Sequence, residues 1–154
     1  TFTLNELEKG SIASFIHIGE MIAMIPTSYM QNALGRKCVL ILTIPLQLLA
    51  WLLIYFLHYV WAILLARILM GLWIGFYFTA CPAYMSESSE ISVRGRVIAQ
   101  LKILSLCGYF FQTIVGAYLS YDAVAIISFM ITFFLYVSIL YIPESIYSLL
   151  RLNR

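Results

Sequence analysis

The sequence predicts an all-α, polytopic membrane protein: a helix bundle with five transmembrane helices. Of its 154 residues, 63% are hydrophobic and only 10% are charged, and the mean hydropathy is +0.96. The apolar residues gather in helix-length segments joined by very short loops. A soluble domain of this length could not bury so much apolar surface, so lipid is the expected solvent.

Five segments are long enough to be these helices, because about 18–20 apolar residues let a helix cross the hydrocarbon core. The first contains one charge, Glu20, between Ser11 and Gly35. The stretches 38–57, 68–86, 103–121 and 123–142 contain no Asp, Glu, Lys or Arg. The expected helices span about 11–34, 38–57, 60–84, 97–120 and 123–142 of a single domain, 1–154.

Basic residues fall on alternate loops and therefore predict the orientation. They form three clusters, after the first, third and fifth segments: Arg36 and Lys37, Arg94 and Arg96, Arg151 and Arg154. Positive loops stay cytoplasmic, so we expect an integral membrane protein, in the plasma membrane, with its N-terminus outside and its C-terminus inside. A chain that begins outside without a signal peptide also suggests a further helix upstream.

Composition argues against several other classes of protein. The net charge of +2 is too small to indicate nucleic acid as a partner. The three cysteines, at 38, 81 and 107, lie in or beside apolar segments without metal-ligand spacing, so no metal site is expected. The sequence shows no nucleophile, base or metal constellation. We expect no catalytic residue, no cofactor and no enzyme activity.

Four motifs stand in order at the ends of these segments. They are Asn32-Ala-Leu-Gly35-Arg36-Lys37; Ala66-Arg67 with Gly71-xxx-Gly75; Pro82-Ala-Tyr84-Met-Ser-Glu87 followed by Arg94-Gly95; and Pro143-Glu144-Ser145. Together they resemble the sugar porter family of the major facilitator superfamily, and within it the facilitated trehalose transporter-like proteins of insects. The resemblance covers essentially the whole chain.

The resemblance implies a partial fold and a function. The family has twelve helices in two halves, and this chain aligns with helices two to six, a partial N-terminal half. Helix one and the C-terminal six-helix half would be its partners, with the lipid bilayer and a small sugar. The implied function is transport of trehalose or a hexose by facilitated alternating access, as part of a longer transporter. The alternative is a non-transporting truncated paralogue or a regulatory membrane subunit.

Charged residues at the cytoplasmic ends are candidates for a gate. In the family, such arginines and glutamates bridge helices on the inner face, and breaking the bridges frees the halves to rock. The alternative is a solvated basic loop that only sets the topology. The candidate gate residues are Gly35, Arg36, Lys37, Glu87, Arg94, Gly95 and Glu144.

The third segment carries the candidate packing residues. Gly71 and Gly75 are spaced to let two helices approach closely in a membrane. Arg67 lies four residues before Gly71, and the resemblance places it near the outer side, where its stem could snorkel.

The fourth segment carries a polar stripe, which must face protein or water because lipid would not solvate it. In sugar porters this helix lines the cavity; the alternative is hydrogen bonding between helices. The candidate cavity residues are Lys102, Ser105, Tyr109, Gln112 and Thr113, with Gly116 and Ser120 on the same arc.

Two charges depart from the family pattern. Lys102 stands where many hexose porters carry a glutamine, and it could reject neutral sugars, favour an anionic ligand, or pair with Glu20. Glu20 is an intramembrane charge that needs a partner or a proton. His17, one turn earlier, suggests either a proton relay with Glu20 or a wet outer vestibule.

Overall fold

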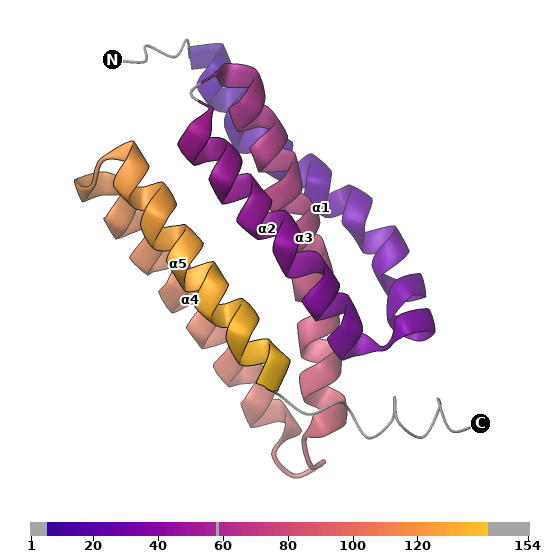
Figure 1. Cartoon of the computed structure of the whole chain (residues 1–154). Coiled ribbons are helices and arrows are strands. Elements are labelled where there is room, and N and C mark those ends of the chain that lie inside the picture. The colour runs from indigo at the N-terminus through magenta and orange to yellow at the C-terminus, as the bar shows by residue number, and fades with distance from the viewer. Residues whose placement is uncertain (1–5, 58, 142–154) are drawn as a thin grey trace.

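Five helices make up the fold (Figure 1). A computed structural model describes residues 6–57 and 59–141. The helices are α1 (Glu6–Leu34), α2 (Arg36–Phe56), α3 (Val60–Ser88), α4 (Arg94–Tyr118) and α5 (Tyr121–Tyr141). The all-α, five-helix bundle expected from the sequence is confirmed. α3 and α4 run a few residues further at the α3–α4 turn than their apolar segments, because helices continue past the hydrocarbon into polar sequence.

Four of the helices, α2 to α5, are long and apolar enough to cross a membrane by themselves. α1 is as long as α3 but contains the polar residues His17 and Glu20. Buried residues are sparse on the spanning helices. Most of their surface is therefore left for lipid or for further protein.

Short connections fix the direction of each helix. Gly35 alone separates α1 from α2; its φ of 89° lies in the left-handed region, which glycine adopts without strain. Its amide donates to the Gln31 carbonyl at 3.1 Å. Consecutive helices run antiparallel, so the α1–α2 turn and the α3–α4 turn lie at the same end of the bundle (Figure 1). The basic positions 36–37 and 94–96 therefore share one end.

α1 and α3 have the most extensive contact in the bundle, and they meet backbone to backbone. A Cβ added at Gly71 would meet the Ile16 carbonyl oxygen. One added at Gly75 would lie 2.7 Å from both the Ala23 Cβ and the Glu20 carbonyl oxygen. Gly19 on α1 is equally tight against α3. The crossing thus requires small residues from both helices.

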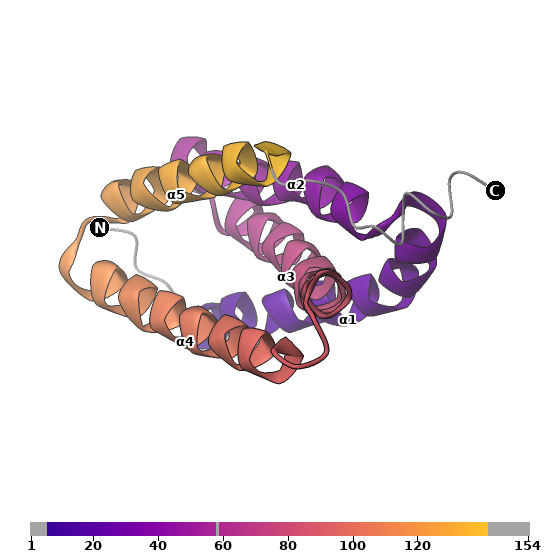
Figure 2. The same cartoon turned by 90° about the horizontal axis from the view of Figure 1, so that it is seen from below.

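The remaining helices pack unevenly around α3. α2 packs against both α3 and α5, and a cluster formed by Ala50, Ile54, Ala66, Met70 and Ala125 joins the three. Figure 2 shows α2 and α5 along one side, α1 and α4 along the other, and α3 between them. α4 makes few contacts, and Val115 is its one buried residue. A whole face of α4 therefore lies open.

Replacing Gly71 or Gly75 with alanine will weaken the α1–α3 crossing. The new methyl meets a neighbouring backbone that cannot move aside, so we expect each change to lower the free energy of unfolding by about 1–3 kcal/mol. Denaturant titration in lipid nanodiscs measures it. Gly108→Ala is the matched control, because its Cβ meets nothing within 4 Å. Equal losses at all three glycines would contradict the crossing.

Candidate functional site

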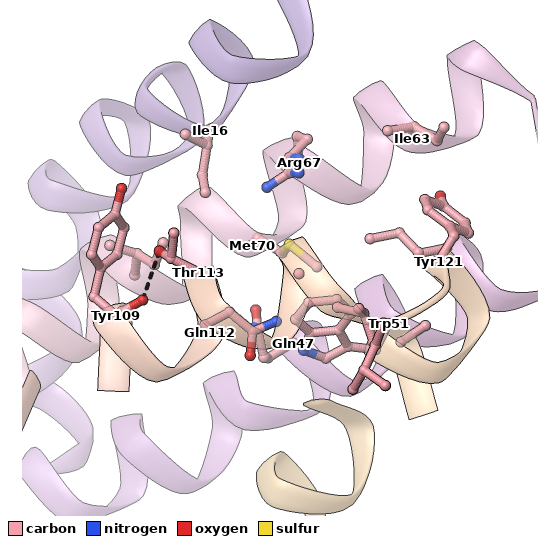
Figure 3. Close-up of a pocket in the computed structure, with 16 residues that line it drawn as sticks. Ile16, Gln47, Trp51, Ile63, Arg67, Met70, Tyr109, Gln112, Thr113 and Tyr121 are labelled. Atoms are coloured by element: carbon pink, nitrogen blue, oxygen red, sulfur yellow. Dashed lines mark hydrogen bonds between the residues drawn. The ribbon is translucent and has the colours of Figure 1, made fainter. Parts of the chain in front are cut away.

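Two adjoining cavities lie between α4 and the other helices. The larger, of about 590 Å³, is lined by residues from all five helices (Figure 3). The smaller, of about 350 Å³, is lined by α2, α3, α4 and α5. Gln47, Trp51 and Gln112 line both cavities. Together the two cavities follow the inner face of α4.

The predicted cavity residues on α4 divide between these spaces. Tyr109, Gln112 and Thr113 line the larger cavity, whereas Ser105 and Gln112 line the smaller. Figure 3 shows Gln112 beside Gln47 of α2. Lys102 is exposed and lines neither space. The structure therefore separates Lys102 from the rest of the stripe.

Three of the five candidate cavity residues on α4 already donate a hydrogen bond within the protein. Ser105 Oγ donates to the Leu101 carbonyl at 2.8 Å, and Thr113 Oγ1 donates to the Tyr109 carbonyl at 2.9 Å (Figure 3). Gln112 Nε2 donates to Ser128 Oγ of α5 at 2.9 Å. Gln112 therefore hydrogen-bonds to another helix and also lines both cavities, so its position agrees with both sequence alternatives.

The opposite walls carry polar atoms of Arg67, which the sequence analysis named, and of three residues that sequence reasoning missed: Gln47, Trp51 and Trp73. Gln47 Oε1, Trp51 Nε1, Trp73 Nε1 and Arg67 Nε are buried, with no hydrogen-bond partner among the described residues. All four residues line one or both cavities. A polar side chain in an apolar segment was the available signal, and Gln47 within 38–57 is its clearest case. A hydrogen-bond donor or acceptor without a partner is costly in a membrane. These polar atoms of the cavity walls therefore need hydrogen-bond partners.

Arg67 lies near the start of α3, toward the end of the bundle opposite the basic turns. It projects from α3 into the larger cavity (Figure 3), near Tyr121 at the start of α5. Its Nε is one of the buried atoms without a partner in the described part of the chain. A guanidinium in this position can bind an oxygen acceptor brought by another group.

At the other end of the bundle, Arg36 and Glu87 form an ion pair. Arg36 Nη2 of α2 lies 2.7 Å from Glu87 Oε1 of α3, and the two side chains are 22% and 24% exposed. This is the end that carries the basic turns. Within the described ranges, Arg36 Nε and Glu87 Oε2 are buried without a hydrogen-bond partner. The pair can therefore accept further polar contacts.

The other candidate gate residues lie around this pair. Gly35 makes the α1–α2 turn, and Lys37 lines a third, mostly apolar cavity of about 150 Å³. Arg94 and Gly95 are exposed at the start of α4. Glu144 lies outside the described residues. Glu87 thus pairs with Arg36 across the α2–α3 interface.

Glu20 finds its partner within its own helix. His17 Nδ1 lies 3.3 Å from Glu20 Oε2, and the two side chains are 74% and 28% exposed. Lys102 is not the partner of Glu20, so that sequence alternative for Lys102 does not describe the structure. No cluster of His, Cys, Asp and Glu suited to a metal occurs in the parts of the chain that the structure describes.

Breaking the Arg36–Glu87 pair will destabilise the bundle. Glu87→Ala leaves a partly buried guanidinium without its carboxylate, which we expect to cost about 1–3 kcal/mol. Thermal unfolding in nanodiscs measures the loss, and the exchanged pair Arg36→Glu with Glu87→Arg should recover much of it. Glu90→Ala, which removes an exposed carboxylate three residues later, is the control. A Glu87→Ala variant as stable as that control would refute the prediction.

The Gln112–Ser128 hydrogen bond will hold α4 against α5. Ser128→Ala removes the acceptor, and bonds of this kind in membranes are worth about 0.6 kcal/mol. We expect faster amide hydrogen exchange along α4, measured by mass spectrometry. Ser138→Ala is the control on α5, since that hydroxyl bonds only to the Phe134 carbonyl of its own helix. Unchanged exchange in α4 would show that other contacts hold it.

Comparison with known proteins places this geometry in a family. Residues 1–148 match the family model of the Major Facilitator Superfamily. The facilitated trehalose transporter Tret1 of Polypedilum vanderplanki is 26% identical over 145 residues, which cover 94% of this chain and 29% of that protein. The sugar transporter ERD6 of Arabidopsis thaliana is 22% identical over 152 residues, covering 99% and 31%.

A third relative, the inositol transporter 4 of Arabidopsis thaliana, is 23% identical over 108 residues, which cover 70% of this chain and 19% of that protein. The chain spans less than a third of the length of these three relatives. The expected resemblance to sugar porters is confirmed. The chain is an integral membrane protein that belongs to the Major Facilitator Superfamily, related to its sugar transporters.

Proposed function

We propose that this chain is part of a transporter that moves trehalose or a hexose across the membrane by facilitated alternating access. One observation above all supports this function. Two cavities run along α4 inside a membrane bundle, and residues of every helix contribute to them; their walls are mainly apolar and carry a few polar side chains, such as Gln47 and Gln112. Such a passage binds and releases a small polyol by hydrogen bonds and ring contacts, without chemical conversion or a cofactor.

We propose two partners that would complete the site: a helix that precedes α1 in the family and a second six-helix half. The buried atoms of Arg67, Gln47, Trp51 and Trp73 support the first, because a helix seated along these cavities could supply the missing acceptors and donors. The open face of α4 supports the second, since substrate sites of such transporters lie between the two halves.

The proposed gate is centred on the Arg36–Glu87 pair. It joins the start of α2 to the end of α3, at the end where the basic turns gather. Lys37, Arg94, Gly95 and Glu144 would extend this charged network to the second half. A few such contacts are enough to bias one of two states, and their loss lets the halves rock.

The proposed setting is the plasma membrane, with the start of α1 outside and the end of α5 in the cytoplasm. The support is that positions 36–37 and 94–96 share one end of the bundle, and basic ends stay cytoplasmic.

Uptake by the full-length protein that contains this chain tests the function. Proteoliposomes should take up labelled trehalose or glucose, with saturation and no energy source. Tyr109→Ala should lower kcat/KM about tenfold, equivalent to about 1.4 kcal/mol of lost ring contact. Phe111→Ala is the control, because its side chain leaves the opposite face of α4. Absence of any uptake would favour the alternative, a non-transporting paralogue or a regulatory subunit.

A further inference from the structure

Glu20 lies near the middle of the membrane-spanning part of the bundle. It is the central residue of α1 and the one Asp, Glu, Lys or Arg between positions 10 and 35. A Cβ built on Gly75, near the centre of the spanning helix α3, would lie 2.7 Å from the Glu20 carbonyl oxygen. A carboxylate at this depth needs a proton, a cation or water beside it.

His17 is the side chain that can supply the proton. Its Nδ1 lies 3.3 Å from Glu20 Oε2, and the two side chains are 74% and 28% exposed. With a neutral imidazole the pair carries a net charge of −1, and with an imidazolium it carries none. Histidine side chains make this change between about pH 5 and 8. The net charge in the middle of α1 therefore depends on whether His17 holds a second proton.

The helices around α1 bring few other ionisable groups to this level. Those on the neighbouring helices are Arg67 and Tyr77 of α3, Tyr55 of α2 and, across the larger cavity, Tyr109 of α4. Arg67 does not lose its proton in a protein, and it points into the larger cavity (Figure 3). Within the described ranges, the ion-pair partner of Glu20 is His17. The protonation of this pair is therefore the variable charge of the region.

His17 stands on a face of α1 that suits protein or water better than lipid. Exposed small or flexible residues recur on this face at spacings of four and three, as in a seam between two helices: Gly10, Ser14, His17, Met21, Met24 and Ser28. The other exposed flank is aliphatic, with Ile18, Ile22 and Ile25. α1 and α4 lie along the same side of the bundle (Figure 2). A second half seated on the open face of α4 would therefore also reach α1.

We propose that the His17–Glu20 pair is a pH-sensitive switch that sets the rate of transport. This inference rests on the proposed function. When the halves rock so that the second half covers His17, water leaves the pair. A net charge of −1 is then costly, whereas a neutral pair is tolerated. The backbone from Ile16 to Glu20 is held against α3, so it cannot move the pair back into water. Alkaline pH therefore opposes this closure and slows transport.

Uptake by the full-length protein that contains this chain tests the switch. Proteoliposomes receive labelled glucose or trehalose, with the same pH on both sides of the membrane. We expect the initial rate at about pH 6 to exceed the rate at about pH 8.5 by about tenfold, equivalent to about 1.4 kcal/mol of preference for the neutral pair.

Two substitutions in the pair give opposite results. Glu20→Gln leaves the pair neutral when His17 is unprotonated, so the alkaline inhibition should disappear and acid should slow uptake instead. His17→Gln leaves the carboxylate without its cation, so uptake should be slow at both pH values. Glu90→Gln, which changes an exposed carboxyl group at the α3–α4 turn, and His58→Gln, which changes the other histidine of the sequence, are the controls. Both should keep the unmodified pH profile.

The outcomes separate this inference from the proposed function. Uptake at one rate across the pH range overturns the switch and leaves the function standing. A Glu20→Gln protein that keeps the alkaline inhibition also overturns the switch, because the titrating group then lies elsewhere. No uptake of either sugar at any pH overturns both.

Discussion

The close contact between α1 and α3 is the constraint on which the rest of the bundle depends. Three glycines, Gly19, Gly71 and Gly75, let two backbones touch where no side chain would fit. α3 is thereby fixed in the middle, and α2 and α5 pack on its other side. The Arg36–Glu87 pair forms only because the end of α3 is held beside the α1–α2 turn. Packing, rather than hydrophobic burial from water, is what organises helices in lipid.

Buried polar atoms without a hydrogen-bond partner among the described residues occur on both sides of the bundle, and four of the seven belong to residues that line the cavities beside α4. Around α3 the side chains are buried and small, whereas the cavity walls beside α4 carry an arginine, a glutamine and two tryptophans with unmet polar atoms. In water such atoms would be hydrated, but in a membrane each of them requires a hydrogen-bonding group beside it. These atoms therefore need groups from outside the described residues: oxygen acceptors for the Trp51, Trp73 and Arg67 donors, and a donor for Gln47 Oε1.

Sequence patterns predicted the helices better than the contacts between side chains. The length of the apolar segments and the positions of the charged residues located five helices, because few other structures can cross a membrane. The Gly71-xxx-Gly75 spacing predicted a close approach, but Gly19 escaped notice because the charged Glu20 beside it dominated that segment. The partner of Glu87 could not be predicted, since Arg36 is distant in sequence. Helical spacing predicted the polar stripe of α4, yet it cannot show which hydroxyl groups donate a hydrogen bond to a carbonyl of their own helix.

The turn at Gly35 is the shortest connection between two helices in the described part of the chain. One residue joins them, and its backbone angles are available to glycine and few others. A connection of one residue restricts how far the end of α1 and the start of α2 can move apart. Residues 89–93, between α3 and α4, form a longer connection. The connection between α3 and α4 therefore has more backbone freedom than the single residue between α1 and α2, and Arg36 stands directly after that short turn.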